Sequence, residues 1–261
     1  MSPRFFRRLP VVFALAQNAW LEQVRHRVFY VILVFGGVVL YSALLLGVMA
    51  VEQELRVLTD LGLSLLDIFG LILSLFGAST LVLQEMQNKT IYLILTRPVK
   101  RYQYLLGRYL GLVGVVWTSL LGMALLHLLL LFWRGWQWNH LYIWMVAFSA
   151  MKVLMLCGLA VAFSLFTTSL VSSLSITFIL WILGHFWNEI RFLMDRLPPH
   201  VSWLFRVMGP FIPNFQILNL RDFWESASVP WTLWVGAAGY ALAYSIACLA
   251  FAALLFEKKE F

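Results

Sequence analysis

Six long runs of apolar residues, separated by short polar segments, dominate the chain. Each run has about the length that a helix needs to cross a lipid bilayer, which is roughly 20 residues. The runs cover approximately residues 29–51, 61–83, 105–133, 141–166, 170–187 and 231–256. The sequence therefore predicts an all-α polytopic membrane protein with six transmembrane helices, forming a single domain over residues 1–261.

The residues before the first apolar run predict a helix that lies in the membrane interface. Between Pro10 and Arg27, apolar and polar side chains separate onto two helical faces. The predicted apolar face carries Phe13, Ala16, Trp20, Leu21 and Val24, and the opposite face carries Asn18, Glu22, Arg25 and His26. We therefore expect residues 1–27 to form an interfacial segment with an amphipathic helix.

The distribution of basic residues predicts the orientation of the six helices. Most of the 19 Lys and Arg residues fall near the N-terminus, around residues 84–104 and at the C-terminus. An excess of Lys and Arg in short loops marks the cytoplasmic side of a membrane. Both termini and the 84–104 loop are therefore expected in the cytoplasm, with the protein in the cytoplasmic (inner) membrane.

Residues 188–231 form the longest segment between two apolar runs, and the orientation predicts that they lie on the extracytoplasmic side. The segment is too apolar for an open loop, and prolines at positions 198, 199, 210 and 213 interrupt it. Irregular backbone at a membrane requires cover from protein or water. We expect short helices packed at the outer mouth of the bundle.

Composition supports a membrane location and excludes several other classes of protein. Hydrophobic residues make up 62% of the chain and charged residues 12%, which leaves too little polar surface for a soluble globule. The net charge of +7 comes mostly from residues at the ends of apolar runs, where they contact anionic membrane lipid, and no basic groove for nucleic acid is predicted. Cys157 and Cys248 lie inside apolar runs and are expected to be packing residues.

The segment from Glu85 to Gly111 is the most concentrated polar and basic interruption in the chain. Within it, Thr90 can cap a short apolar turn over residues 91–95, and Pro98 ends this turn before the next apolar run. The pattern predicts a small helix lying on the cytoplasmic surface of the membrane between spans two and three.

This segment resembles the coupling element of the permease subunits of type-2 ABC transporters. In that family a Glu, a Thr turn, a short apolar helix, a Pro and a basic pair contact the ATPase, and the layout of the whole chain is similar as well. On this resemblance, the contact with the ATPase is made by Glu85, Lys89, Thr90, Ile91, Leu95, Arg97, Pro98, Lys100 and Arg101. Residues 212–215, with Asn219 and Asp222, also resemble the region that follows the fifth span in many of these permeases.

The resemblance implies a subunit of an ATP-driven exporter that pairs with a second permease subunit, identical or similar, and binds a separate ATPase. The chain has no Gly-x-x-x-x-Gly-Lys-Ser/Thr loop, so ATP and Mg are expected on the ATPase and no cofactor on this chain. Two alternatives stay open. One is a related permease that extracts lipid or protein without passage of a solute, and the other is a polytopic scaffold or enzyme that uses no ATP. No sequence motif of a membrane hydrolase favours the enzyme, and no catalytic residue is predicted.

Two charged residues, Asp67 and Lys152, fall inside apolar runs. Charges in a membrane are costly and are therefore candidates for function. The sequence leaves three interpretations open: the two residues pair with each other, they contribute to substrate passage, or they reach toward the membrane surface. His127 and His185 are expected to be hydrogen-bonded packing residues, and so few donors predict no metal site.

Small residues at the start of the third apolar run predict a close contact between helices. Gly107 and Gly111 form a Gly-x-x-x-Gly pair. Such pairs allow two helix backbones to approach closely in a membrane. We therefore expect another helix on this face.

Overall fold

The structure, a computed structural model of the chain, describes residues 11–24, 54–79, 100–167, 169–194, 209–220 and 230–258, together with residues 30, 33–34, 36–38, 40–41, 44–45, 196, 198 and 202–203. The regular secondary structure of these residues is entirely helical. This part of the prediction, an all-α protein, is confirmed.

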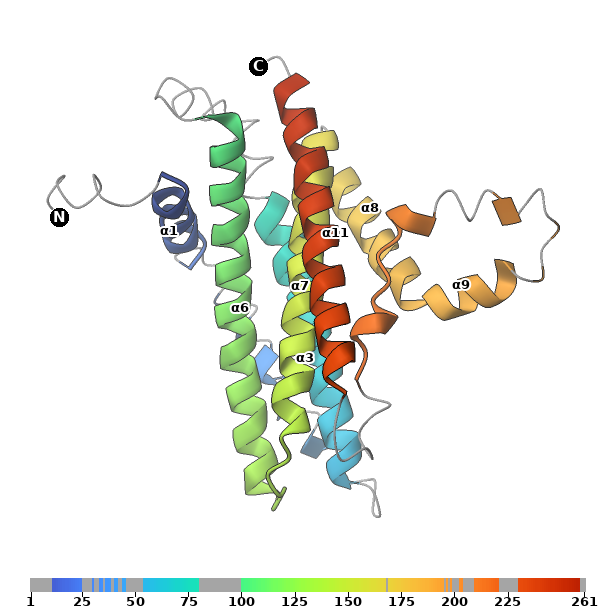
Figure 1. Cartoon of the computed structure of the whole chain (residues 1–261). Helices are drawn as coiled ribbons and strands as arrows, with labels where there is room; N and C mark the ends of the chain where they lie inside the picture. Colours follow the sequence, from blue (N-terminus) through green and yellow to red (C-terminus); the bar gives the residue numbers. More distant parts are fainter. Residues whose placement is uncertain are drawn as a thin grey trace, which may run out of the picture.

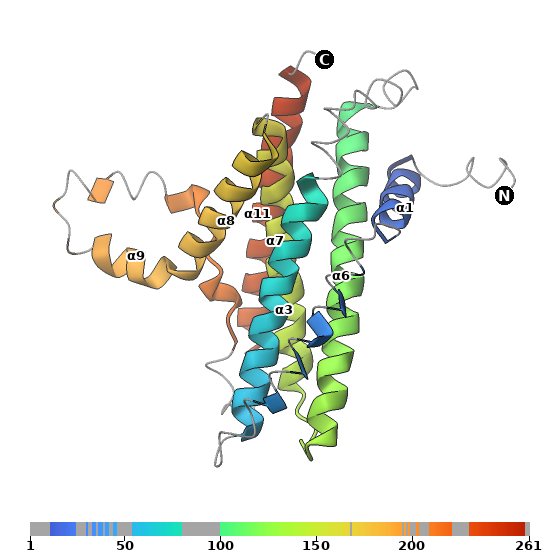
Figure 2. The ribbon, with the colours of Figure 1, turned by 180° about the vertical axis from the view of Figure 1, so that it is seen from behind.

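Four long helices lie side by side and form the body of the protein (Figures 1 and 2). They are α3 (Glu54–Ala78), α6 (Arg101–Trp133), α7 (Leu141–Phe166) and α11 (Trp231–Lys258). Each is long and apolar enough to cross a membrane. α3, α7 and α11 run in one direction and α6 runs in the other (Figure 1). A fifth candidate span is bent: α8 (Leu170–His185) is followed by α9 (Trp187–Met194) at an angle of 70°.

The described residues therefore give four to five candidate membrane spans and support a membrane protein. The first predicted span, over residues 29–51, falls largely outside the described residues, although those described between 30 and 45 are helical. The count of six spans stays a prediction.

α7 is the central helix of the body, because it packs against α3, α6, α8 and α11. Its buried side chains include Phe148, Val153, Leu156 and Cys157, each at most 1% exposed. α11 differs, since several of its large apolar side chains face outward, among them Ile246 at 64% and Leu254 at 60% exposure. Such a surface suits contact with lipid or with another membrane helix.

α6 begins and ends at residues with identifiable capping roles. At its start, the side-chain oxygen of Gln103 accepts a hydrogen bond from the backbone N–H of Lys100 at 3.2 Å. At its end, Gly135 has a φ of +81°, and the N–H of Trp136 donates to the carbonyl of Leu131 at 3.0 Å. This is the Schellman arrangement, in which a glycine adopts the left-handed conformation after the helix. It turns the chain from α6 toward α7.

The structure corrects the predicted start of the second span. α3 begins at Glu54, whereas the apolar run predicts a start near residue 61, so Glu54 and Asp60 lie within this helix. Leu58, which is 2% exposed, packs into the core on this added part of the helix. Acidic residues near a helix N-terminus interact favourably with the helix dipole, so charge here does not end the helix.

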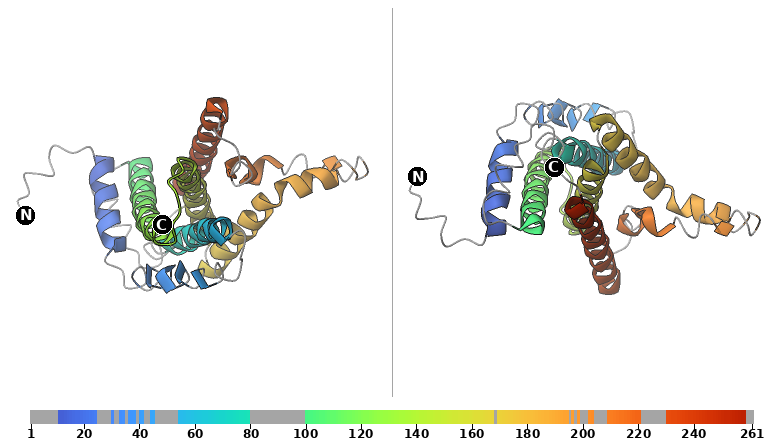
Figure 3. Two further views of the ribbon diagram at one scale, coloured as in Figure 1. Left: turned by 90° about the horizontal axis from the view of Figure 1, so that it is seen from below. Right: turned by 90° about the horizontal axis from the view of Figure 1, so that it is seen from above.

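α1 (Val11–Val24) lies against the flank of α6 (Figures 1 and 3). Phe13 and Leu21, from the predicted apolar face, are 56% and 39% exposed and are directed away from the body. The face that packs on α6 contains Ala19, which is fully buried, and Gln23, whose side-chain amide donates to the Gly77 carbonyl at 3.4 Å. Ala16 and Trp20, also from the predicted apolar face, lie next to Gly111 and Gly114 of α6, so the packed face and the predicted apolar face overlap in part.

The predicted fifth span ends earlier than its apolar run. α8 stops at His185, and α9 then extends sideways from the body (Figures 1 and 3). Two short 3-10 helices, η2 (Gly209–Phe211) and η3 (Gln216–Leu218), lie on the return path to α11. The sequence predicts short helices within residues 188–231, and the described residues of this range contain α9, η2 and η3.

Candidate functional site: a polar cavity between α3, α7 and α8

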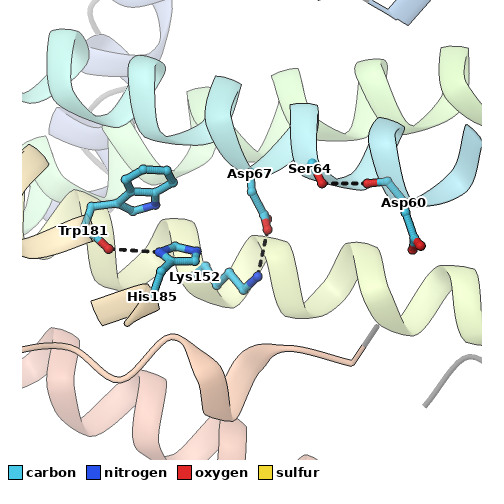
Figure 4. A network of polar contacts seen from close by, with 6 residues as sticks. All are labelled: Asp60, Ser64, Asp67, Lys152, Trp181 and His185. Carbon is cyan, nitrogen blue, oxygen red and sulfur yellow. Dashed lines mark hydrogen bonds and ion pairs between the residues drawn. The ribbon is translucent and has the colours of Figure 1, made fainter. Parts of the chain in front are cut away.

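The two intramembrane charges meet between neighbouring helices. The ammonium of Lys152 on α7 donates to Oδ2 of Asp67 on α3 at 2.8 Å (Figure 4). The side chains are 9% and 8% exposed, respectively. Both residues lie near the midpoints of their helices. The structure thus brings together two residues that are far apart in the sequence, in the paired arrangement that sequence analysis left as one of three interpretations.

A cavity of about 210 Å³ lies beside this ion pair. Its walls come from four parts of the chain: α3, α7, α8 and the return segment around η3. The lining residues are Ser64, Asp67, Ile68, Lys152, Trp181, His185, Phe215, Gln216 and Asn219. The cavity therefore combines one acidic group, one basic group, an imidazole, a hydroxyl and two amides with aromatic walls.

His185 lines the cavity from the last turn of α8, and its hydrogen bond defines the chemistry of its ring. Its Nδ1 lies 2.9 Å from the carbonyl oxygen of Trp181 (Figure 4). A carbonyl oxygen only accepts, so Nδ1 must carry the hydrogen. In the neutral ring, Nε2 is therefore an acceptor. The rings of His185 and Phe215 are 5.2 Å apart, which continues the aromatic wall.

The return segment is fixed to the end of α8 by close backbone contacts. A side chain at Gly184 would overlap the Pro213 carbonyl, so glycine is required for this approach. The Phe215 N–H donates to the Gly184 carbonyl at 3.2 Å, and the Gln216 amide donates to the His185 carbonyl at 2.5 Å. These bonds place Gln216 at the cavity wall.

The same segment is also bound to α11. The N–H of Asn214 donates to the hydroxyl of Tyr240 at 2.8 Å, and the hydroxyl of Tyr244 donates to the Phe211 carbonyl at 2.8 Å. Residues 211–216 therefore connect α8 with α11 along one side of the cavity.

Most of the predicted contacts with an ATPase fall on residues that the structure does not describe. These are Glu85, Lys89, Thr90, Ile91, Leu95, Arg97 and Pro98. Lys100 is described and exposed at the start of α6. Arg101 donates from Nη1 to the carbonyls of Phe256 and Glu257, at 2.9 and 3.0 Å. Arg101 therefore holds the end of α11, a structural task that the sequence did not predict for it.

Gly107 and Gly111 face α1. A Cβ at Gly107 would lie 2.5 Å from Cβ of Leu15, and one at Gly111 would lie 2.5 Å from Cβ of Ala19. Real Cβ atoms do not approach so closely, and the two helices can touch here because both positions lack a side chain. The helix on this face thus comes from the same chain.

His127 forms a second buried polar group, away from the cavity. Its Nδ1 lies 3.0 Å from the hydroxyl of Tyr142, and its Nε2 lies 3.3 Å from the carbonyl of Leu58. The ring touches Gly62 so closely that a side chain there would overlap it. His127 joins α3, α6 and α7 as a hydrogen-bonded packing residue.

Sequence analysis singled out Asp67, Lys152 and His185 but not their common cavity. It missed Trp181 and Gln216 as lining residues, because neither belongs to a motif and only the return of the chain after α9 brings Gln216 to α8. Among the residues that the structure describes, no group of three His, Cys, Asp or Glu side chains could hold a metal ion. Comparison of the chain with models of known protein families and with curated proteins found no match.

Proposed function

We propose that the chain is the membrane-spanning permease subunit of an ATP-driven ABC transporter, with export as its direction. A separate ATPase subunit binds the segment over residues 84–104, which connects α3 to α6. The observation that carries the proposal is the joining of two adjacent, packed apolar helices by a strongly basic segment that resembles the coupling element of type-2 ABC permeases. The proposal places this segment and both termini in the cytoplasm.

The packing of α3 and α6 supports a mechanical role for this segment. Both helices contact each other and α7. A push on residues 84–104, delivered when the ATPase subunits close on ATP, would act on the end of α3 and on the start of α6 together. Because α6 also holds α1 and the end of α11, the displacement would reach most of the body. Transport then follows from a rigid-body tilt of these helices.

The exposed apolar surface supports a second permease subunit as a partner. α8 and α11 expose large side chains on their outer sides, including Val171 at 68% and Ile246 at 64%. In the proposed assembly, part of this surface contacts the second permease subunit and the rest contacts lipid. The chain itself binds neither ATP nor Mg and catalyses no reaction.

Co-purification from native membranes tests the proposal. The tagged chain is expected to recover an ATP-binding subunit in a stable complex. The double variant Ile91→Asp with Lys100→Glu places charge on the predicted contact and is expected to reduce the recovery at least about tenfold, as for the loss of an interface hot spot. Arg101 is left intact, because its substitution would also release α11.

A matched control reverses one charge at the other end of α6. Arg134→Glu lies directly after α6, is exposed, and is expected to leave the recovery of the ATPase unchanged. Undiminished recovery with the double variant would reject residues 84–104 as the contact. A stable chain that recovers no ATP-binding subunit at all would reject the transporter and favour a scaffold or enzyme that uses no ATP.

A further inference from the structure

The buried ion pair and its adjacent cavity have a chemistry that selects a ligand class. Asp67 and Lys152 satisfy each other's charge at 2.8 Å in a region with little exposure. Removing one partner from such a pair is strongly unfavourable, because the other charge stays buried without compensation. A neutral ligand, or one with a single charge, therefore cannot open the pair without leaving a buried charge.

We propose that this cavity binds a compact zwitterionic group. The ligand's ammonium replaces Lys152 at the carboxylate of Asp67, and its phosphate or carboxylate replaces Asp67 at the ammonium of Lys152. One internal ion pair is thereby exchanged for two intermolecular ones, and every charge keeps a partner. The inference rests on the proposed function for its role in transport, whereas binding itself requires only this chain.

The remaining cavity wall suits such a ligand. Gln216 and Asn219 line the cavity with amide groups that can both donate and accept. Trp181 and Phe215 add aromatic surface. An aromatic face attracts a cation within about 6 Å of the ring, which favours an ammonium group on this side. The wall therefore offers partners for both ends of a zwitterion.

The size of the cavity and the exposure of one of its lining residues narrow the choice of ligand further. A volume of about 210 Å³ accommodates a group of about seven non-hydrogen atoms, given that one water occupies about 30 Å³ in the liquid. Phosphoethanolamine is a group of this size. Ile68, which lines the cavity, is 41% exposed, so this part of the cavity wall lies at the outer surface of α3. A lipid headgroup could enter there with its acyl chains outside.

Binding to the purified full chain in a neutral detergent tests the inference. The probes are dihexanoyl phosphatidylethanolamine, which is zwitterionic, and dihexanoyl phosphatidylglycerol, which has the same chains but only a negative charge. Isothermal titration calorimetry is expected to show at least about tenfold tighter binding of the zwitterionic probe, because the second charge-assisted contact is absent in the other. Equal affinity for both probes would overturn the inference.

Two variants test the position of the site. Asp67→Asn with Lys152→Met removes both charges together and avoids an isolated buried charge; it is expected to lose the preference for the zwitterion. Ser64→Leu narrows the cavity, leaves the ion pair in place and is expected to weaken binding at least about tenfold, since steric overlap replaces contact. If the charge-free variant does not fold, Ser64→Leu decides the outcome. Wild-type affinity in a folded form of either variant would overturn the inference.

The matched control removes another ion pair, away from the cavity. Glu22→Gln with Arg108→Met removes the ion pair between α1 and α6 and is expected to retain the preference for the zwitterionic probe. Loss of the preference in this variant as well would show that the effect is not specific to the cavity and would overturn the inference.

Soluble glycerophosphoethanolamine, whose phosphodiester carries the same single negative charge as the lipid headgroup, distinguishes the two sources of the ligand. Binding of the lipid probe alone assigns the site to a lipid headgroup, and binding of the free compound in competition with the lipid assigns it to the shared zwitterionic group. Binding of the free compound alone assigns it to a soluble zwitterion. Binding of neither would overturn the inference. Failure to recover an ATPase from membranes would reject the proposed function but would not change these results.

Discussion

The guanidinium of Arg108 on α6 lies 2.8 Å from the carboxylate of Glu22 on α1. Arg108 sits between the two glycines that let α1 approach α6, so charge and close packing act at the same contact. Glu22 is 51% exposed, and an ion pair with an exposed partner contributes only modestly to stability. The close backbone approach at the glycines is therefore expected to contribute more to the attachment of α1.

Gly111→Ala tests this attachment. The new Cβ would lie 2.5 Å from Cβ of Ala19 and 2.7 Å from the carbonyl oxygen of Ala16, so α1 must shift. We expect the free energy of unfolding to fall by about 1–3 kcal/mol, the usual cost of overpacking. Titration with sodium dodecyl sulfate, followed by circular dichroism, measures the change.

Gly122→Ala is the control for this prediction. It lies on the same helix, and a Cβ there has no atom within 4 Å apart from its own helix and chain neighbours. Because Ala has a better helix propensity than Gly, this variant is expected to be neutral or up to about 1 kcal/mol more stable. Equal effects of the two substitutions would contradict close packing at Gly111.

Arg101 is expected to stabilise the last turn of α11. Its guanidinium donates to the carbonyls of Phe256 and Glu257, which the helix itself leaves without partners. Arg101→Met should therefore destabilise this turn by about 1–2 kcal/mol. The measurement is faster amide hydrogen exchange over residues 253–257.

Lys100→Met provides the comparison, because it removes the same charge from the neighbouring, exposed position. Exchange in the last turn of α11 is expected to stay at the wild-type rate in this variant. If both substitutions accelerate exchange equally, a general effect of charge, and not the hydrogen bonds of Arg101, stabilises the turn.

Tyr142→Phe is expected to destabilise the contact between α6 and α7. The hydroxyl of Tyr142 donates to the Ala124 carbonyl at 2.9 Å and lies 3.0 Å from Nδ1 of His127. Its removal deprives buried polar groups of a partner, which costs about 1–3 kcal/mol. Thermal unfolding in detergent measures the loss. Tyr102→Phe is the control, since Tyr102 is 46% exposed, and it should unfold at the wild-type temperature.

The central helix of the body was predictable from local sequence alone. α7 has the bounds expected from its apolar run, residues 141–166, because both ends of that run are polar and lipid requires every backbone group inside it to be hydrogen-bonded within the helix. The start of α3 was not predictable in this way, since the helix begins at Glu54 and its first turns contain charged residues that precede the apolar run. The bend after α8 was missed for the opposite reason: the apolar run continues to Trp187 across it.

Long-range contacts set the limit for the candidate site. A charge within an apolar run identified Asp67 and Lys152, but no sequence spacing relates two residues that are 85 positions apart. Gln216 reaches the cavity only because Gly184 permits the return segment to lie against α8. The hydrogen bonds of Arg101 to the end of α11 were not predictable for the same reason, and its contact with an ATPase stays a prediction.

The ion pair at the cavity leads to a prediction about stability that is independent of any ligand. Asp67→Asn or Lys152→Met alone leaves one buried charge without its ionic partner and is expected to cost about 3–5 kcal/mol. The two substitutions together remove both charges and should restore most of that loss, because a buried ion pair is often replaceable by neutral groups at little cost. Unfolding of the two single variants and the double variant, measured under one set of conditions, gives the coupling energy. Additive losses would contradict a direct interaction between Asp67 and Lys152, whereas recovery in the double variant would show that the pair is dispensable for stability.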